Sequence, residues 1–312
     1  MTAFAFVFPG QGSQSVGMLD GWGDHPAVQQ TLAEACDALG EDLASLIHAG
    51  PEEALELTTN TQPVMLVAGV ACYRAWRAEG GAEPAAMAGH SLGEFSALVA
   101  AGALELSDAV PLVRFRAQAM QQAVPVGTGA MAAILGLDAA TVCAVCAEVA
   151  AQSGEVVEPA NFNHPTQTVI AGSKAGVELA CQALKALGAK RALMLAVSAP
   201  FHSSLMKPAA DALRERLATL RLQVPRVPIV NNVDVAVQTE PQALRDALVR
   251  QAFGPVRWVE VMRALRARGL NHVIECGPGK VLAGMARRID GEVVAGTVHD
   301  PASLAETKGL LV

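Results

Sequence analysis

The sequence predicts an α/β fold with a mostly parallel sheet, flanking helices and an inserted ferredoxin-like subdomain. Three observations lead there. Short apolar runs alternate with helical patterns along most of the chain, as in parallel strands joined by helices. Of 312 residues, 52% are hydrophobic and only 4% aromatic, which suits strands covered by alanine-rich helices. Residues 128–198 interrupt this rhythm with the order strand, helix, strand, strand, helix, strand.

The N-terminal part is predicted to contain two short buried strands, residues 3–8 and 85–89. Helical patterns cover residues 26–40, 51–59, 63–79, 92–103 and a segment that begins near Ser107 as its N-cap. Gly80-Gly81 ends the third of these helices. The second strand turns at Ser91 directly into a helix, so this connection is tight.

Residues 128–198 are predicted to form the small subdomain, which leaves 1–127 and 199–312 for the large domain. The expected strands are residues 131–137, 156–162, 168–173 and 191–199, and the expected helices are 139–151 and 174–187. This βαββαβ order is that of ferredoxin-like folds.

After residue 199 the strand and helix alternation resumes. The expected strands are residues 228–235, 272–277 and 292–298, and the expected helices are 207–220, 241–252, 257–268 and the segment after the glycine-rich turn at 277–279. In a parallel sheet the carboxyl ends of the strands share one edge, where active sites assemble. Reactive side chains are therefore expected at the ends of the strands.

Composition excludes several classes of protein. The net charge is −7, with no basic stripe, so a nucleic-acid binder is not expected. The N-terminus lacks the basic start of a signal peptide, and the apolar run 63–73 is too short to span a membrane, so we expect a soluble cytoplasmic protein. Six scattered cysteines, including Cys143 and Cys146 without a second pair, predict free thiols and no metal site.

Two glycine-rich turns do not match nucleotide-binding motifs. After GQG at 10–12, the dinucleotide fingerprint requires a further glycine where Ser15 stands. The GPGK at 277–280 has Ile274 in place of the first glycine of a phosphate loop and Val281 in place of its Ser/Thr. Nucleotide binding is therefore not predicted.

Ser91 lies in the pattern Gly89-x-Ser91-x-Gly93, between a strand and a helix. A nucleophile elbow needs small residues on both sides of the serine, because the backbone passes close to itself there. The N–H of Leu92, at the start of the helix, would be free to bind an oxyanion. The alternative is a small serine in a tight connection without chemistry.

A serine nucleophile needs a base, and His202 is the best candidate among seven histidines. It stands just after a predicted strand and before a helix, at a sheet edge. His90 adjoins Ser91, but consecutive side chains point in different directions. The alternative for His202 is a surface histidine that caps a helix.

Arg116 lies on an apolar helical face with residues 109, 112, 113 and Met120. An unpaired charge on such a face is costly, so the guanidinium needs an anionic partner. That partner could be a protein carboxylate or the carboxylate of a substrate. The sequence leaves both open.

These features together resemble the malonyl-CoA:acyl carrier protein transacylases, over essentially the whole chain. The resemblance rests on ordered blocks: FPGQGSQ (8–14), TQPVM (61–65), GHSLGEFSAL (89–98), Arg116 with Met120, AVPVGTGAMAAI (123–134), NFNHP (161–165), VSAPFHSSLMKPAA (197–210), VNNVD (230–234), ALVRQ (247–251) and GPGKVLAGM (277–285). It implies a hydrolase-like large domain in which Ser91 accepts the acyl group and His202 is its base.

The resemblance also implies roles for the surrounding residues. The Gln251 carbonyl would orient His202, in place of an acidic third member, and the Gln11 and Leu92 N–H groups would bind the oxyanion. Arg116 would hold the malonyl carboxylate. Met120 and Phe201 would line the acyl pocket, and the bulk of Phe201 favours malonyl over methylmalonyl groups.

The implied substrates are malonyl-CoA and the phosphopantetheine thiol of a holo-acyl carrier protein, used in turn by one serine for fatty-acid biosynthesis. No permanently bound cofactor, and a monomer, are expected. Carrier proteins are acidic, so docking needs basic patches, for which Lys190-Arg191 and Arg287-Arg288 are candidates. The alternative is that these residues are solvated helix and loop ends.

Three alternatives remain at this point. One is an acyltransferase of a polyketide or malonate decarboxylase system, with the same fold and site but another partner. Another is a serine hydrolase, which would release free malonate and commonly has an acidic triad member. The third is a non-enzymatic binding module, in which Ser91 and His202 would be incidental.

Overall fold

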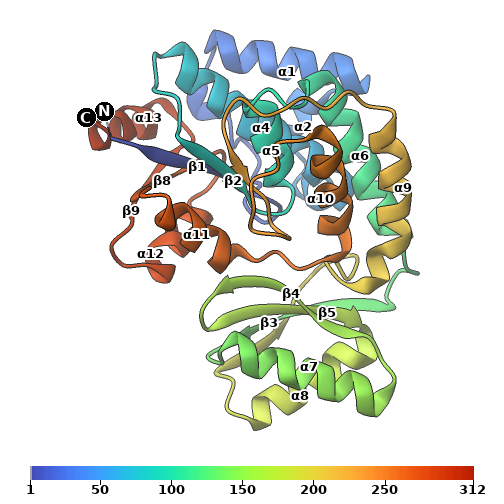
Figure 1. The fold of residues 1–312 in the computed structure, drawn as a ribbon. Coiled ribbons are helices and arrows are strands. Elements are labelled where there is room, and N and C mark those ends of the chain that lie inside the picture. The colour runs from blue at the N-terminus through green and yellow to red at the C-terminus, as the bar shows by residue number, and fades with distance from the viewer. Residues whose placement is uncertain (1) are drawn as a thin grey trace.

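The computed structural model describes residues 2–312 and confirms the mixed α/β fold (Figure 1). The sheet of the large domain has the order β7-β2-β1-β8-β9, and every neighbouring pair is parallel. Its strands are β1 (Phe4–Phe8), β2 (Ala86–Gly89), β7 (Ile229–Val230), β8 (His272–Cys276) and β9 (Val294–Val298). The predicted parallel sheet with flanking helices is therefore correct.

Helices cover both faces of this sheet, because successive residues of a strand point to opposite sides. On β1, Phe4, Phe6 and Phe8 pack into one buried cluster, while Ala5 and Val7 belong to another. The first cluster contains residues of α1 (Pro26–Leu39), α2 (Leu43–Ala49), α3 (Glu52–Glu56), α4 (Thr58–Ala78), α5 (Gly93–Ala100), α6 (Leu106–Gln122), α9 (Lys207–Ala218), α10 (Pro241–Phe253) and α13 (Pro301–Leu310). The second contains residues of α11 (Trp258–Ala267) and α12 (Val281–Ile289).

The small subdomain is the separate body below the large sheet in Figure 1. Its antiparallel sheet has the order β4-β5-β3-β6, which is the ferredoxin-like strand order. Its elements are β3 (Gly129–Leu135), α7 (Ala139–Ser153), β4 (Val157–His164), β5 (Gln167–Ser173), α8 (Lys174–Ala186) and β6 (Arg191–Met194). Both helices cover one face of the sheet.

The strand β4 joins the subdomain to the large domain through backbone hydrogen bonds. The Val256 N–H donates to Ala160 O at 2.8 Å, and the Phe162 N–H donates to Val256 O at 2.9 Å. Val256 lies between α10 and α11 of the large domain. The other face of the small sheet can therefore form one wall of a cleft between the two bodies.

Two strands are shorter than predicted. The strand expected at 191–199 ends at Met194: the Leu195 N–H still donates to Met131 O of β3, but residues 195–197 then turn to line a pocket. The strand expected at 228–235 ends at Val230, because the next backbone N–H groups have other acceptors: that of Asn231 donates to Ala236 O and that of Asn232 to a carboxylate. Apolar side chains predict burial there, but not the direction of the backbone.

Several helix boundaries also differ. The helix expected at 51–59 breaks at Leu57, whose ψ of 121° is extended, so that α3 and α4 are separate and Pro63 lies inside α4. Ser107 does not cap α6; Glu105 is the N-cap and makes no side-chain capping bond. Four elements have no counterpart in the prediction: the helices α2 and α13 and the 3-10 turns η1 (Asp20–Trp22) and η2 (Ser204–Met206).

The six cysteines are free, with Cys36 and Cys143 partly exposed and the other four buried. Burial raises the pKa of both Cys72 and Cys146 to about 12, so these thiols stay protonated and act as small apolar side chains. Within residues 2–312, no helix combines the length and the apolar character needed to cross a membrane.

Candidate active site

Ser91 stands on the turn between β2 and α5, with a φ of 51°. The turn requires glycine on both sides of it. A Cβ on Gly89 would lie 1.9 Å from the carbonyl carbon of Gly93, and a Cβ on Gly93 would lie 2.0 Å from Phe8 O. Neither contact is sterically allowed, so the two glycines permit the close backbone approach that lifts Ser91 out of the sheet.

His202 meets Ser91 from the loop between β6 and α9, 111 residues away in the chain. Its Nε2 lies 2.7 Å from Ser91 Oγ, and the histidine is only 5% exposed. Its Nδ1 lies within hydrogen-bond distance of two backbone carbonyls, 2.9 Å from Gln251 O and 3.2 Å from Gly254 O. Two carbonyl acceptors require a proton on Nδ1, so Nε2 is left to accept the hydroxyl proton of Ser91.

The imidazole of His202 is held in its neutral form. Burial, and then the positive charge of Arg116, lower the pKa of His202 to about 3. The two carbonyl oxygens at Nδ1 act in the opposite direction but are weaker. At neutral pH the ring is therefore available as a base and, once protonated, readily gives its proton up.

Two backbone N–H groups beside Ser91 have no hydrogen-bond acceptor within residues 2–312: those of Gln11 and Leu92. Leu92 is the N-cap of α5, and both residues line the same pocket as Ser91. The Gln11 side chain is tied to Thr58, donating from Nε2 to Oγ1 at 3.2 Å. The two N–H groups can thus bind an anion at the pocket wall.

Arg116 is only 2% exposed and reaches Ser91 from α6. It donates from Nη1 to Gln62 Oε1 at 2.8 Å and from Nη2 to Gln251 Oε1 at 2.9 Å. Its Nη2 also lies 3.4 Å from Ser91 Oγ, and its guanidinium carbon lies 5.4 Å from the centre of the Phe95 ring. The guanidinium is thereby fixed in place beside Ser91.

No carboxylate forms an ion pair with Arg116 anywhere in residues 2–312. Burial lowers the pKa of Arg116 to about 10, against the opposing effect of Glu94, so the guanidinium remains charged at neutral pH. Glu94 itself is 4% exposed, and burial raises its pKa to about 7. The sequence left two partners open for Arg116, a protein carboxylate or the carboxylate of a substrate. Within residues 2–312 no protein carboxylate pairs with it directly.

A pocket of about 400 Å³ lies in front of Ser91, between the large domain and the face of the small sheet that α7 and α8 leave open. Met120 and Phe201 line it, together with Met131, Leu195 and Val197 of the subdomain side. The wall is thus largely apolar around a small polar centre, as is usual for small-molecule sites.

His90 is not available as the base. Its Nε2 lies 2.8 Å from Asn163 Oδ1, and its ring packs edge-on against Trp258 with 5.4 Å between the ring centres. Burial lowers the pKa of His90. It therefore serves as a packed, neutral hydrogen-bonding residue in the pocket wall, in keeping with the expectation that it cannot serve Ser91.

The two basic pairs considered for carrier docking are exposed, but they do not line the pocket. Arg287 and Arg288 form the last turn of α12. Lys190 and Arg191 lie at the start of β6, where Arg191 is paired with Leu135. Leu135 shares a face with Met131, so Arg191 lies on the pocket side of the small sheet, roughly 13 Å along β3 from the pocket.

Sequence reasoning missed three polar residues that hold the site together: Gln62, Glu94 and Asn232. Glu94 accepts hydrogen bonds from Gln251 Nε2 at 3.1 Å and from the Asn232 N–H at 3.0 Å. A signal existed for Glu94, since it is the one charged residue in an otherwise apolar helix, LGEFSALVA. Gly254, the second acceptor for His202, gave no such signal.

Known proteins match this chain over most of its length. The family model of the acyl transferase domain matches residues 5–297. The malonyl CoA-acyl carrier protein transacylase of Escherichia coli K12 is 55% identical over 306 residues, 98% of each chain. The crystal structure of an acyl-carrier-protein S-malonyltransferase from Burkholderia pseudomallei is 64% identical, with a TM-score of 0.96 over 98% of this chain and 99% of that one.

A further solved structure, 51% identical with a TM-score of 0.95, shows a malonyl-transacylase in complex with the holo acyl-carrier protein of a type II polyketide synthase. It covers 97% of this chain and 98% of that one. The similarity in each case extends over both bodies of the fold, and so includes the pocket between them.

Proposed function

The chain belongs to the malonyl-CoA:acyl carrier protein transacylases of the acyl transferase family, and on this premise we propose that it moves malonyl groups from malonyl-CoA to a holo-acyl carrier protein. It is an acyltransferase, and the acyl group is carried in between as an ester on Ser91. The carrier accepts the malonyl group on its phosphopantetheine thiol, for fatty-acid biosynthesis.

The observation that carries this proposal is the position of Arg116. A buried cation, held by two amide oxygens and paired with no carboxylate in residues 2–312, lies 3.4 Å from the attacking oxygen. In a malonyl group the free carboxylate is separated from the reacting carbonyl by a single methylene. Arg116 can therefore bind that carboxylate while Ser91 attacks, whereas an acetyl group would leave the cation unpaired.

In the first half-reaction, Ser91 Oγ bonds to the thioester carbon of malonyl-CoA as its proton passes to His202 Nε2. The electron pair of the carbonyl moves onto its oxygen, where the Gln11 and Leu92 N–H groups stabilise the negative charge. The C–S bond then breaks, and His202 Nε2–H protonates the departing CoA thiolate. The products are malonyl-Ser91 and free CoA.

His202 needs no acidic partner for these steps. The Gln251 and Gly254 carbonyls keep Nδ1 protonated and aim Nε2 at Ser91. Burial and the charge of Arg116 lower the pKa of the imidazole, so its protonated form readily gives a proton to the departing thiolate.

In the second half-reaction, His202 takes the proton of the phosphopantetheine thiol, and the sulfur attacks the malonyl-Ser91 ester. The same N–H groups bind the oxyanion, and the ester C–O bond breaks as His202 returns its proton to Ser91 Oγ. One site thus serves both substrates in turn, a ping-pong scheme. No resident cofactor is part of the proposal.

The proposal extends to the acyl group and the partner. Met120 and Phe201 bound the acyl pocket, and the ring of Phe201 crowds an α-methyl substituent, which favours malonyl over methylmalonyl groups. Among the candidate docking residues Lys190, Arg191, Arg287 and Arg288, the place of Arg191 on the pocket side of the small sheet favours Arg191. A monomeric, cytoplasmic enzyme completes the proposal.

Intact-mass spectrometry after incubation with malonyl-CoA alone tests the reaction. The wild type should gain about 86 Da, while Ser91→Ala should gain nothing, because only the serine can form the ester. Addition of holo-carrier protein should then transfer the adduct to the carrier. A wild type without adduct, with malonyl-CoA intact, would contradict the proposal.

The fate of malonyl-CoA in the same incubation, together with carrier competition and binding measurements, separates the alternatives. A serine hydrolase would convert malonyl-CoA to free malonate without a carrier. An acyltransferase of polyketide synthesis would acylate Ser91 but prefer the carrier of that system, so competition between a fatty-acid carrier and a polyketide carrier for one acyl-enzyme decides the pathway. A binding module would bind malonyl-CoA equally well with and without Ser91.

A further inference from the structure

The backbone at Ser91 adopts a conformation that the residue does not prefer. Its φ of 51° lies in the left-handed region, which is unfavourable for residues with a Cβ. Such a conformation persists only where the surrounding structure holds it. The groups that hold this turn therefore control where Ser91 Oγ lies relative to His202.

The side-chain amide of Asn232 binds the turn at two points. Its Oδ1 accepts the Ser91 N–H at 2.8 Å, and its Nδ2 donates to Gly89 O at 2.7 Å. Asn232 is fully buried. Because one partner is a donor and the other an acceptor, the amide satisfies both in this orientation.

Asn232 is itself fixed by backbone hydrogen bonds. Its N–H donates to Glu94 Oε2 at 3.0 Å, and its carbonyl accepts the Arg257 N–H at 3.2 Å. Glu94 also accepts from Gln251 Nε2 at 3.1 Å, and the same Nε2 donates to Ser91 O at 2.9 Å. The amide of Asn232 therefore has little freedom to move away from the turn.

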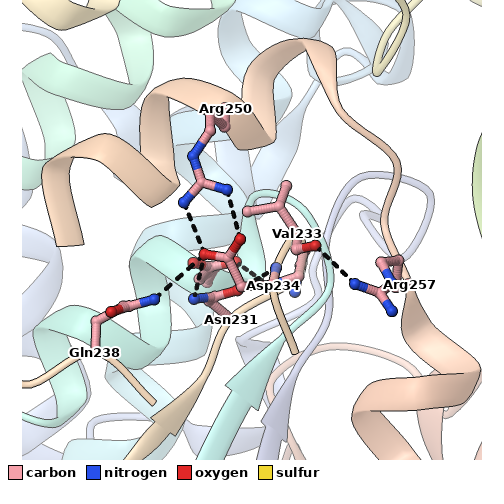
Figure 2. A network of polar contacts seen from close by, with 8 residues as sticks. Asn231, Val233, Asp234, Gln238, Arg250 and Arg257 are labelled. Atoms are coloured by element: carbon pink, nitrogen blue, oxygen red, sulfur yellow. Dashed lines mark hydrogen bonds and ion pairs between the residues drawn. The ribbon is translucent and has the colours of Figure 1, made fainter. Parts of the chain in front are cut away.

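The loop that carries Asn232 is tied to α10 and α11, as Figure 2 shows. Asp234 pairs with Arg250 through two hydrogen bonds, of 2.5 and 2.7 Å, and Arg257 Nη1 donates to Val233 O at 3.1 Å. Arg250 directly precedes Gln251, whose carbonyl orients His202. One short unit thus holds the loop of Asn232 and the acceptor of His202 together.

We propose that Asn232 is a positioning residue for the nucleophile: its amide fixes the turn at Ser91 so that Oγ meets His202 Nε2. Asn232 touches neither substrate nor the reacting atoms, and it acts through the backbone on both sides of His90. This inference rests on the proposed function, since it concerns the rate at which Ser91 is acylated.

Two substitutions test the two hydrogen bonds separately. Asn232→Ala removes both. Asn232→Asp is nearly isosteric and keeps an acceptor for the Ser91 N–H, but an ionised carboxylate cannot donate to Gly89 O and repels it. A neutral carboxyl can do both, because it has an O–H donor and an acceptor oxygen. The nearest titratable neighbour of the introduced group is Glu94, and the charges of Arg116 and Asp234 act on Glu94 in turn, so the ionisation of the introduced group is set within this cluster.

The measurement is the rate of Ser91 acylation by malonyl-CoA, from quenched samples and intact mass, between pH 5 and pH 8. Asn232→Ala should be at least about tenfold slower at every pH, since a small misplacement of reacting atoms is costly. Its half-saturating malonyl-CoA concentration should stay within about twofold of the wild type, because Arg116 is unchanged. Position 232 is fully buried, and burial should raise the pKa of the introduced carboxyl into this pH range. The rate of Asn232→Asp relative to the wild type should therefore rise at least about tenfold from pH 8 to pH 5.

The control is Asn60→Asp, which removes an equivalent bond, Nδ2 to Ala54 O at 2.9 Å, away from the turn. Its rate relative to the wild type should not change with pH. Circular dichroism at each pH checks that every variant is folded. If Asn232→Ala does not fold, the pH dependence of Asn232→Asp alone tests the inference. A pH-independent ratio for Asn232→Asp overturns the inference, and so does acylation within twofold of the wild type by Asn232→Ala at any pH or by Asn232→Asp at pH 8. A wild type that is not acylated overturns the proposed function, and this inference with it.

Discussion

Replacement of Arg116 by alanine should convert the enzyme from one that selects malonyl-CoA into one that no longer distinguishes it from acetyl-CoA. In the wild type the guanidinium is held by Gln62 Oε1 and Gln251 Oε1, at 2.8 and 2.9 Å. After truncation these two amide oxygens would face the substrate carboxylate with no cation between them. The malonyl carboxylate would then enter a buried site that repels it.

The structure gives the size of this effect. Arg116 is 2% exposed, so the ion pair with the substrate forms out of water. Truncation of one partner of such a buried pair costs about 2–5 kcal/mol. That corresponds to a fall of about 30- to 5,000-fold in kcat/KM for malonyl-CoA. For acetyl-CoA, which has no carboxylate, the change should stay within about threefold.

The assay measures kcat/KM for both thioesters, through release of CoA in the presence of holo-carrier protein. Arg114→Ala is the matched control, because Arg114 lies on the same helix but pairs with Glu41 at 2.6 Å outside the pocket. It should leave the selectivity unchanged. Equal losses for both thioesters in Arg116→Ala, or a loss for malonyl-CoA below about threefold, would refute the reasoning.

Two further predictions concern the pocket wall and the core. Phe201→Ser should raise kcat/KM for methylmalonyl-CoA relative to malonyl-CoA by about 10- to 200-fold, since room for one methyl group is worth about 1–3 kcal/mol; an unchanged ratio in competition assays would show that another residue excludes the methyl group. Burial raises the pKa of Glu275 from 4.5 to about 7, so the folded protein keeps a proton that the unfolded chain releases, and stability falls as the pH rises from 4.5 to 7. Glu275→Gln lacks this carboxyl, so its free energy of unfolding should fall by about 3 kcal/mol less than that of the wild type over this pH range. Urea unfolding at both pH values measures the difference. The same pH dependence in both proteins would contradict the assignment.

The fold was predictable where local signals and packing agree. The apolar runs of β1 and β2 are buried throughout, and the glycines around Ser91 allow only one tight turn. The strand and helix order of residues 128–198 is compatible with few topologies, and the ferredoxin-like sheet is one of them. These features depend on residues that are close together in the sequence.

Strand ends were less predictable, because distant groups decide them. Residues 195–197 have the apolar pattern of a strand, yet they line the pocket. β7 stops at Val230 because the next N–H groups find acceptors in Ala236 and in Glu94, the latter 138 residues away from its donor Asn232. No local pattern encodes an acceptor that lies on another element.

The sequence by itself determined the chemistry that is available: a serine in a glycine-bounded turn, a histidine after a strand, and an arginine on an apolar helical face. Only the tertiary structure decided how these groups act. It placed His202 2.7 Å from Ser91, gave Arg116 two amide oxygens in place of a carboxylate, and set Asn232 under the turn. The physical reason is that a side chain's charge and direction depend on burial and on partners more than 50 residues away, which the order of residues along the chain does not specify.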